Sequence, residues 1–516
     1  MNLLWLALAV SSLARVTGSE SPFSIVIDGG STGSRLHVFE FLSKEDGVEC
    51  VRRGSARANG PLSGFARLSD EMEQQPIDRD AVADHLMPAF LHATKTIPEA
   101  YHASTRVWYG ATAGMRLLSE SEQDAIYDAV YEGLLARPNF VFRGMRRADI
   151  GTLPGSLEGY YGAVAANYLK GTIDANLEMD KMVSTINSHG PIGALDMGGA
   201  STQIVFLPPK ENQEAEDQTC AADDKDACAK ETREDRMHEN DFFSTSYLSY
   251  GADQFRIRLW DVLVEEHRLE SEDGTACTSE IIQNPCSFPG YETEWDGFTL
   301  IGTGDAEECA RQVKRLIPHP TEEVEENLGT HVGGVAHPPV RGKFFAMSLY
   351  FFTLDSLREL STNDKEAHEA LNLSWPNPSI QELYNALDGL CERAWKGDLE
   401  EIQHSAHAFT RAEVLPHRCI ESVYMVTLLR DGFGFPPESR DITFTFLVDG
   451  SEVEWSLGMA LSKRLEELTS ETNLTKNNVT KKPLLQDTEG QTPTDELSWN
   501  QNETRSEIEQ LLSPVS

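Results

Sequence analysis

Residues 24–35 read SIVIDGGSTGSR, and residues 192–202 read IGALDMGGAST. In each stretch a short apolar run ends on an aspartate, Asp28 or Asp196, and a loop rich in small residues follows. The apolar run predicts a buried strand, the loop predicts a turn, and the alternating or apolar residues after each loop predict a second strand. The same strand–loop–strand unit therefore occurs twice in the chain.

The duplicated unit predicts the fold class. Two copies of one hairpin, with strand and helix segments between them, indicate two similar α/β lobes rather than a repeat array. The chain has 516 residues, and a single hydrophobic core usually stops growing at roughly 250–300 residues, so the length also favours two lobes. We therefore expect an α/β protein in which the two Asp-led loops face each other.

The net charge excludes one class of partner. The chain carries 44 Lys and Arg against 83 Asp and Glu, a formal net charge of −39. A field of this sign repels the phosphates of nucleic acids, so we expect no nucleic-acid partner. The same field repels a free nucleotide, and any nucleotide site therefore needs local N–H donors, an arginine and a divalent cation.

The N-terminus predicts entry into the secretory pathway. Residues 3–10 are apolar and small residues follow as far as Gly18, a run too short to span a bilayer comfortably. We interpret residues 1–18 as a cleaved signal peptide, and a short signal anchor is the alternative. No later run reaches the roughly 18 apolar residues of a membrane helix, so we expect no transmembrane segment in the mature chain.

Cysteines and glycosylation triplets agree with that pathway. The eight cysteines include no CxxC pair, which in a secretory protein favours disulfides over zinc ligands. Asn-x-Ser/Thr triplets, the acceptors of N-glycosylation, begin at Asn372, Asn473, Asn478 and Asn502. We expect a secreted glycoprotein with disulfide bonds, located outside the cell or in a Golgi, ER or vacuolar lumen.

Two segments are unlike the rest of the chain. Residues 211–240 are crowded with charged side chains and include Cys220 and Cys228, which indicates a solvated acidic insertion. Residues 466–516 have few apolar positions and predict a disordered, glycosylated tail.

The loop over residues 29–34 fits an anion. Its glycines let the backbone approach closely, its N–H groups and hydroxyls can hold phosphate oxygens, and Arg35 adds a planar charged fork. Taken alone, the loop would be an ordinary Gly-rich turn, and a single aspartate after a strand would be an Asx turn. The matched pair Asp28 and Asp196 instead favours two carboxylates that hold Ca2+ or Mg2+ across a cleft.

Two further stretches carry candidate groups. Residues 108–116, WYGATAGMR, bring Thr112 and Arg116 near a turn, and Glu158 precedes the apolar helix expected over residues 157–168. On their own, these features are explained by helix packing and by a charge at a helix start.

Five motifs occur in an order that resembles a known family. They are DGGSTGSR (28–35), ATAGMR (111–116), LEGYYGAVAANY (157–168), DMGGASTQI (196–204) and YMVTLLRDGFGF (424–435). They resemble the apyrase conserved regions of the nucleoside triphosphate diphosphohydrolase family, also called the apyrase or nucleoside phosphatase family. Further similarity lies at residues 246–256, 342–352 and 453–461, and the form at 428–434 is most similar to soluble plant-type apyrases.

The resemblance implies a fold and its boundaries. The family has two actin-like, ribonuclease H-like lobes with the active site in the cleft between them. On this basis we expect a first lobe over residues 22–149 plus 438–465 and a second lobe over residues 150–437. The chain departs from the family at Ala163, where a Trp is usual, and at Gly29, where Ala is usual.

The resemblance also implies residue roles. Asp28 and Asp196 would hold the metal through water, Glu158 would be the general base, and Ser201 and Gln203 would help to place the attacking water. Tyr350 and Phe433 are the aromatic residues expected near the nucleotide base. The expected phosphate contacts are Gly30, Ser31, Thr32, Gly33, Ser34, Arg35, Thr112, Gly198, Gly199 and Ala200.

The predicted function is metal-dependent hydrolysis of the terminal phosphates of nucleoside tri- or diphosphates such as ATP or GDP. An activated water would attack in line and inorganic phosphate would be released, without a phosphoenzyme. Two alternatives stay open, a kinase of the actin-like fold group and a non-catalytic nucleotide-binding protein. The sequence selects neither the preferred nucleotide nor the oligomeric state.

Overall fold

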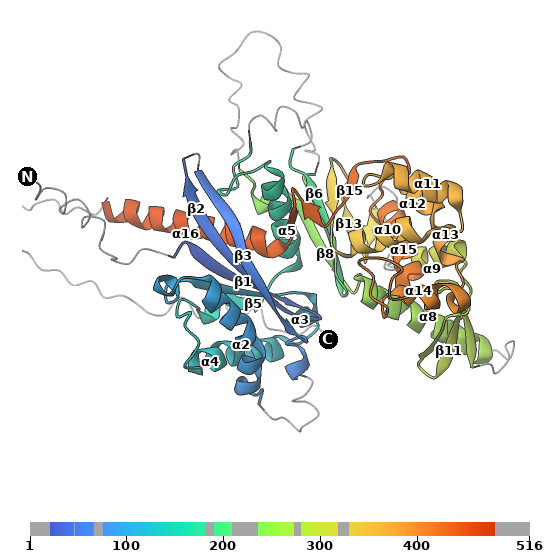
Figure 1. Ribbon diagram of the computed structural model, residues 1–516, viewed down its shortest axis with the longest axis horizontal. Coiled ribbons are helices and arrows are strands. Elements are labelled where there is room, and N and C mark those ends of the chain that lie inside the picture. Colours follow the sequence, from blue (N-terminus) through green and yellow to red (C-terminus); the bar gives the residue numbers. More distant parts are fainter. Residues whose placement is uncertain are drawn as a thin grey trace, which may run out of the picture. The chain divides into compact units, whose positions relative to one another are not determined.

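The computed structural model describes residues 21–45, 47–66, 76–180, 190–208, 236–272, 280–317 and 330–479 (Figure 1). The predicted signal peptide at 1–18, most of the acidic insertion at 211–240, and residues 480–516 of the predicted tail lie outside the described residues. None of the described helices combines the length and the apolar character that crossing a membrane requires.

The first sheet contains the first predicted hairpin. Its strand order is β3-β2-β1-β4-β5, in which β1, β2 and β3 are antiparallel and β1, β4 and β5 are parallel. Asp28 at the end of β1 pairs with Arg35 on β2 and with Gly110 on β4. The bounds are β1 Phe23–Gly30, β2 Gly33–Lys44, β3 Gly47–Asn59, β4 Arg106–Ala111 and β5 Ile150–Thr152.

The second sheet repeats this plan. Its order is β8-β7-β6-β14-β15, again three antiparallel strands followed by two parallel ones. Its bounds are β6 Gly193–Met197, β7 Ser201–Phe206, β8 Phe243–Leu248, β14 Phe344–Ala346 and β15 Ile442–Phe444. The duplication read from the two hairpins therefore extends to two whole sheets.

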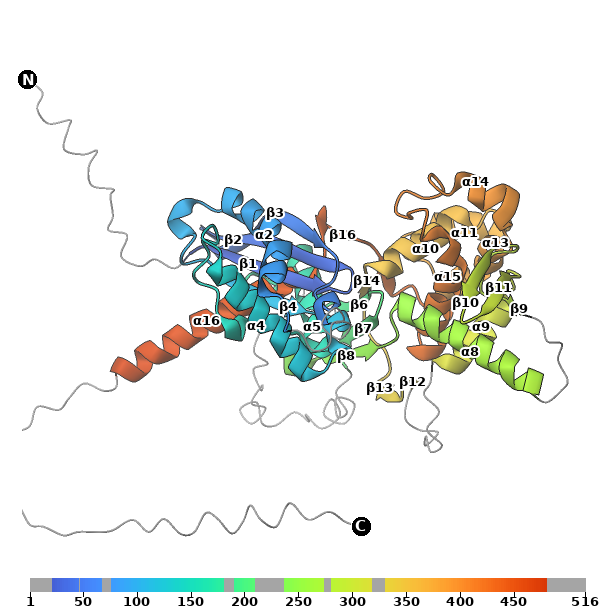
Figure 2. The same cartoon turned by 90° about the horizontal axis from the view of Figure 1, so that it is seen from below.

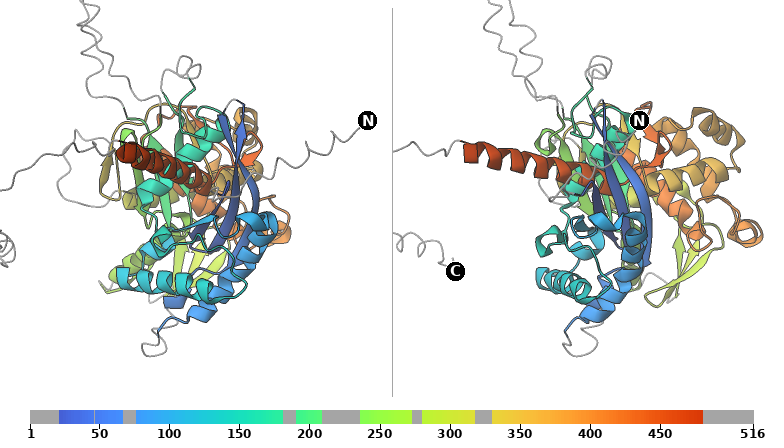
Figure 3. Two further views of the ribbon diagram at one scale, coloured as in Figure 1. Left: turned by 90° about the vertical axis from the view of Figure 1, so that its left-hand side faces the viewer. Right: turned by 60° about the vertical axis from the view of Figure 1, so that its left-hand side comes forward.

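The alternation of side chains along β1 separates two cores. Ile25 and Ile27 pack against α2 (Arg79–Thr96) and α4 (Glu120–Ala136). Val26, which points to the other face, packs with α5 (Gly155–Lys170) and the start of α16 (Trp455–Val479). Both covering layers of the first sheet can be followed in Figure 3.

Helix α5 is shared by both sheets. One side carries Tyr160 and Val164 toward the first sheet, and the other carries Ala163 and Ala166 toward Ala194 of the second sheet. Ala163, at the position where the family usually has Trp, is fully buried. The small side chain lets α5 lie close to the second sheet.

The helices of the second lobe gather beside a small sheet with the order β10-β11-β9 (Figure 2). The helices are α8 Ala252–Glu272, α9 Ala306–Leu316, α10 Leu349–Leu360, α11 Lys365–Ser374, α12 Ile380–Asn385, α13 Leu387–Cys391, α14 Glu400–Ile402 and α15 Arg418–Thr427. The remaining elements are α3 Ala113–Arg116, β9 Ile281–Asn284, β10 Glu292–Trp295, β11 Phe298–Gly302, β12 Thr330–Val332, β13 Val335–His337, β16 Leu447–Val448 and β17 Ser451–Glu452.

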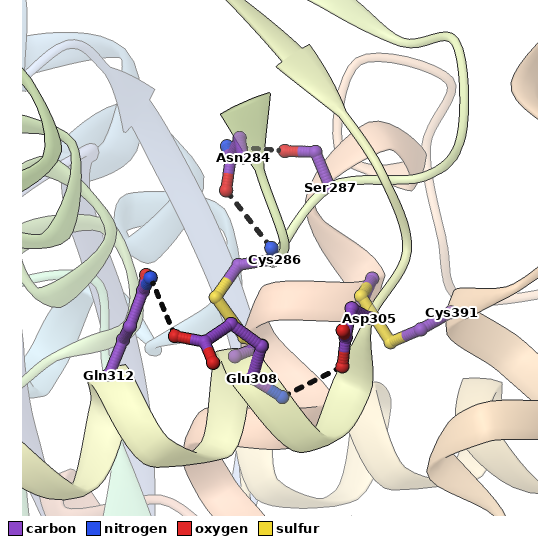
Figure 4. Close-up of a disulfide and its surroundings, with 9 residues drawn as sticks. Asn284, Cys286, Ser287, Asp305, Glu308, Gln312 and Cys391 are labelled. Atoms are coloured by element: carbon purple, nitrogen blue, oxygen red, sulfur yellow. Dashed lines mark hydrogen bonds between the residues drawn. A yellow bond between two sulfur atoms is a disulfide. The ribbon is translucent and has the colours of Figure 1, made fainter. Parts of the chain in front are cut away.

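Two disulfides lie in this region: Cys286–Cys309 joins the segment after β9 to α9, and Cys391–Cys419 joins α13 to α15. The first lies at the start of α9, where Asp305 caps the helix by accepting the backbone N–H of Glu308 (Figure 4). Cys50 is a buried free thiol. The predicted disulfides are thus present for four cysteines, while Cys220, Cys228 and Cys277 lie outside the described residues.

One expected lobe boundary requires correction. We placed residues 438–465 in the first lobe, but β15 pairs with β14 in the second sheet because the apolar Ile442 and Phe444 are buried there. The chain rejoins the first lobe at Trp455, which packs with Val26 and Trp108. The predicted boundary at residue 466 agrees with the compact unit, which ends at Leu465, whereas the helical conformation of α16 continues to Val479, within the segment predicted to be disordered.

Candidate functional site

The two aspartates that end the matched strands come together with Glu158. Burial, together with the charges of Glu158, Glu454 and Asp196, raises the pKa of Asp28 to about 7, while the charge of Arg35 opposes the shift. The pKa of Asp196 is also raised by burial. Three carboxylates from the β1 hairpin, from α5 and from the β6 hairpin therefore form one cluster.

The first loop is built on close backbone approach. A Cβ added at Gly29 would lie 2.3 Å from Tyr109 Oη, so a larger residue at this position would require the Tyr109 ring to shift. Ser31 and Thr32 are exposed at the tip of the loop. Ser34 is 2% exposed and lies 3.3 Å from the Tyr109 hydroxyl, so its side chain points inward rather than toward a phosphate, contrary to expectation.

Thr112 lies behind this loop. Its backbone N–H donates to the Gly29 carbonyl at 3.0 Å, and its side chain is buried. A Cβ added at Gly114 would lie 3.0 Å from Ser31 Cα, so α3 also contacts the loop directly. The ATAGMR segment therefore supports the first loop from behind.

The second loop is fixed by the first turn of α8 and by Ser249, which precedes this helix. The carbonyls of Gly198, Gly199 and Ala200 accept backbone hydrogen bonds from Ala252, Asp253 and Ser249 at 3.0, 3.0 and 2.8 Å. These bonds turn the loop carbonyls toward α8. The backbone of residues 198–200 is thereby held in one conformation beside Asp196.

Glu158 lies in the first turn of α5, in an ion pair with Arg116. Burial raises the pKa of Glu158 to about 7 and the charge of Asp196 adds to this, while the Arg116 guanidinium opposes the shift. Burial outweighs the opposing charge because Glu158 is only 8% exposed.

A chain of hydrogen bonds joins the three predicted catalytic residues. Gln203 Nε2 donates to Ser201 Oγ at 2.9 Å and to Ser246 Oγ at 3.0 Å. Arg116, the partner of Glu158, donates to the same Ser246 hydroxyl at 3.4 Å. Ser246 is thus a site residue that our candidate set missed, although it begins the SYLSYGADQFR segment.

Ser348 was missed as well. Its side chain hydrogen-bonds Asp196, and it lies immediately before α10 with a φ of 52°. A left-handed backbone at a serine is rare, and no sequence pattern indicates it.

The expected base contacts require correction. Tyr350 and Phe433 are 0% and 1% exposed in the second-lobe core. The Tyr350 hydroxyl lies 3.0 Å from Thr202 Oγ1, and the Phe433 ring packs on Tyr247. The helical period of α10 directs Tyr350 to the core together with Leu354. Phe433 is buried in the same core, so neither ring is accessible for stacking on a base.

Other aromatic residues are accessible at the same helix. Phe352, Phe409 and Phe446 form a partly exposed group, with ring centroids 5.6 Å apart for Phe352 and Phe409 and 5.1 Å for Phe409 and Phe446. Phe409 is 43% exposed. Phe352 lies about one helical turn beyond Ser348, the residue that contacts Asp196.

A second cluster of possible metal ligands is structural. Ligand atoms of Asp355, Glu359 and His407 lie within 4.8 Å of one another. His407 Nδ1 lies 2.8 Å from Thr410 Oγ1 and Nε2 lies 3.1 Å from Asp355, while Arg358 pairs with both carboxylates. Arg358 and His407 already engage the two oxygens of Asp355, so the cluster is held together without a cation.

A model of the GDA1/CD39 (nucleoside phosphatase) family matches residues 15–480. Ectonucleoside triphosphate diphosphohydrolase 8 of Homo sapiens is 28% identical over 482 residues, covering 88% of this chain and 85% of that protein. The Golgi apyrase of Saccharomyces cerevisiae is 26% identical, covering 86% of this chain and 71% of its own length.

A solved structure shows the same fold. The crystal structure of nucleoside triphosphate hydrolases from Neospora caninum matches with a TM-score of 0.59 and 16% identity, and covers 87% of this chain and 93% of that one. Together with the duplicated sheets, this match confirms the predicted two-lobed, actin-like α/β fold.

Proposed function

The chain belongs to the GDA1/CD39 (nucleoside phosphatase) family, and from this membership we propose that it hydrolyses the terminal phosphate of nucleoside tri- or diphosphates with a bound divalent cation. The observation that carries the proposal is the convergence of Asp28, Glu158 and Asp196 beside two Gly-rich hairpin loops. The names of the relatives, which include triphosphate diphosphohydrolases and an apyrase, agree with this substrate class.

The donor set fits Ca2+ or Mg2+. Carboxylate oxygens are the ligands that these hard cations take in proteins. Burial and like charges raise the pKa of Asp28, and a positive charge beside it would relieve that repulsion. We assign Asp28 and Asp196 to hold the cation through its waters. A cation held there would neutralise negative charge on the phosphates.

Glu158 is the proposed general base. Its pKa of about 7 matches proton transfer near physiological pH. Glu158 accepts a proton from a water, the water attacks the terminal phosphorus in line, and the bond from phosphorus to the bridging oxygen breaks. Ser201 and Gln203 orient the water, while Ser246 and Arg116 hold Gln203 and Glu158 in place.

The two loops receive the phosphates. Exposed Ser31 and Thr32 with Gly30 contact phosphate oxygens from one side, and the backbone of residues 198–200 does so from the other. We assign the stacking of the base to Phe352 and Phe409, because their rings are accessible at the helix that also presents Ser348 to Asp196.

The proposed compartment is the secretory pathway, with the protein secreted or held in a lumen. The two disulfides support this assignment, because such bonds persist in oxidising compartments.

A panel of phosphate-release assays tests the function. The purified protein is mixed with ATP, ADP, GDP or UDP, with Ca2+, with Mg2+ or with excess EDTA. We expect inorganic phosphate from at least one nucleotide, only with the cation and without an added acceptor. Release that required a sugar would instead indicate a kinase, and nucleotide binding without any release would indicate a non-catalytic binding protein.

A further inference from the structure

Glu454 stands at the junction between β17 and α16, with a side chain that is only 15% exposed. One carboxylate oxygen accepts a hydrogen bond from Arg35 at 2.5 Å. The other oxygen lies 2.8 Å from an Arg52 nitrogen and 3.2 Å from His37 Nδ1. Glu454 thereby brings a segment near the C-terminal end of the folded chain to the strand that follows the first phosphate loop.

Arg35 has a competing carboxylate close by. It is the direct antiparallel partner of Asp28, and directly opposed residues present their side chains on the same face of a sheet. Cβ atoms in such a pair are about 4.5–5.5 Å apart, well within the reach of an arginine. Among the described residues, however, the ion pair of Arg35 is with Glu454 and none joins it to Asp28.

The pairing of Arg35 with Glu454 instead of Asp28 affects both ligands proposed for the site, the cation and the phosphate. A guanidinium paired with Asp28 would neutralise the carboxylate that the cation needs. Held by Glu454, Arg35 keeps a side chain that is 44% exposed, and the bond to Glu454 uses only one of its terminal nitrogens, Nη1. The remaining N–H donors are left for an anion at the mouth of the loop.

We propose that Glu454 is a positioning residue that holds Arg35 away from Asp28 and presents its guanidinium to the terminal phosphate. The inference rests on the proposed function, in which Asp28 serves a cation, and on the role that the sequence predicts for Arg35 as a phosphate contact. Glu454 itself touches neither group.

A neutral substitution at Glu454 suits the site. Glu454, Glu452 and Arg52 also line a cavity of about 600 Å³, so the carboxylate lies at a solvent space rather than in close-packed core. Glutamine has nearly the same shape as glutamate and removes only the charge.

Glu452 provides a matched control. It also pairs with Arg52, at 3.3 Å, and lines the same cavity, but its side chain is 54% exposed and its ion pair does not include Arg35. Glu452→Gln therefore makes the same charge change two residues away, without releasing Arg35.

The test measures Ca2+ binding to the nucleotide-free full-length protein by calorimetry, together with KM and kcat for ATP. We expect Glu454→Gln to weaken Ca2+ binding and to raise KM, each by about tenfold, because a hydrogen bond to a charged group contributes about that much. Glu452→Gln should stay within about twofold of wild type for both quantities.

A double variant separates positioning from a general structural effect. If Glu454 acts by restraining Arg35, adding Arg35→Gln to Glu454→Gln restores Ca2+ binding, because no guanidinium is left to occupy Asp28. Equal Ca2+ binding in Glu454→Gln and Glu452→Gln would overturn the proposal, and so would a double variant that stays as weak as Glu454→Gln. A wild-type protein that released no phosphate would instead refute the proposed function, and the comparison of Ca2+ binding would still decide the role of Glu454.

Discussion

The Ser246 hydroxyl accepts a hydrogen bond from Gln203 Nε2 at 3.0 Å. The same oxygen also accepts a hydrogen bond from Arg116, the partner of Glu158. A Cβ added at Gly155 would lie 2.2 Å from Ser246 Cβ, so the start of α5 is pressed directly against this serine. One side chain on β8 thus connects Gln203, which we propose orients the water, with the partner of Glu158, which we propose accepts the proton of that water.

Loss of this hydroxyl should slow the chemical step. We expect Ser246→Ala to lower kcat by about tenfold with little change in KM, since it removes hydrogen bonds that orient Gln203 and Arg116 rather than substrate contacts. The matched control is Ser244→Ala, on the same face of β8, whose hydroxyl donates to the Ser156 carbonyl instead. Equal kinetics for the two variants would show that the hydroxyl of Ser246 has no special role.

Substitution of the accessible aromatic should weaken nucleotide binding. We expect Phe409→Ala to raise KM for ATP by about fivefold to a hundredfold, because stacking of a base on an aromatic ring contributes about 1–3 kcal/mol. Tyr350→Phe removes only the contact with Thr202 in the core and should leave KM unchanged. The assignment of the base site fails if KM responds to Tyr350→Phe and not to Phe409→Ala.

Only part of the candidate site could be predicted from the sequence. The two hairpins and Glu158 were located because each is a local motif of consecutive residues, and the family they indicated is confirmed. Ser246, Ser348 and Glu454 approach the site through contacts between distant segments, which no local pattern reveals. Tyr350 was assigned wrongly because Tyr350 and Phe352 lie on opposite sides of α10. Only the packing of the helix shows that Phe352 is the accessible one.

The lobe boundary near residue 438 could not be predicted from local sequence either. β15 covers only Ile442–Phe444, and a run this short is indistinguishable in sequence from a linker. Its pairing with β14 depends on a segment about a hundred residues earlier in the chain, residues 344–346.

Metal-free protein should lose stability as pH rises. Burial and neighbouring charges raise the pKa of Asp28 and of Glu158 to about 7, above unfolded values of about 4. The folded state then binds more protons than the unfolded state, so the contribution of these two carboxyls to stability is fully present below about pH 4 and is lost as pH rises through about 7. In EDTA the thermal midpoint should fall between about pH 5 and pH 8, and Ca2+ should reduce the fall.

Asp28→Asn supplies the control for that slope. It removes one of the clustered carboxylates, so the dependence of the midpoint on pH in EDTA should become flatter than in wild type. Superimposable curves for the two proteins would show that Asp28 does not carry the raised pKa.

Removal of a disulfide should destabilise the second lobe. The Cys391–Cys419 bond closes a segment with a sequence separation of 28, and replacing both cysteines with alanine should cost about 2–4 kcal/mol in the free energy of unfolding. Cys50→Ala, which removes a buried free thiol, should cost about 1 kcal/mol. Urea unfolding measures both values, and equal losses would argue against the bond as a source of stability.

The most direct test of the account is Glu158→Gln, with phosphate release and nucleotide binding measured on one preparation. The substitution keeps the shape of the side chain at the start of α5 but removes its ability to accept a proton. We predict that phosphate release with Mg2+-ATP falls by at least about a hundredfold while ATP still binds within a few-fold of wild type. Phosphate release at the wild-type rate would contradict the assignment of Glu158 as the general base, and with it the hydrolytic mechanism built on this cluster of carboxylates.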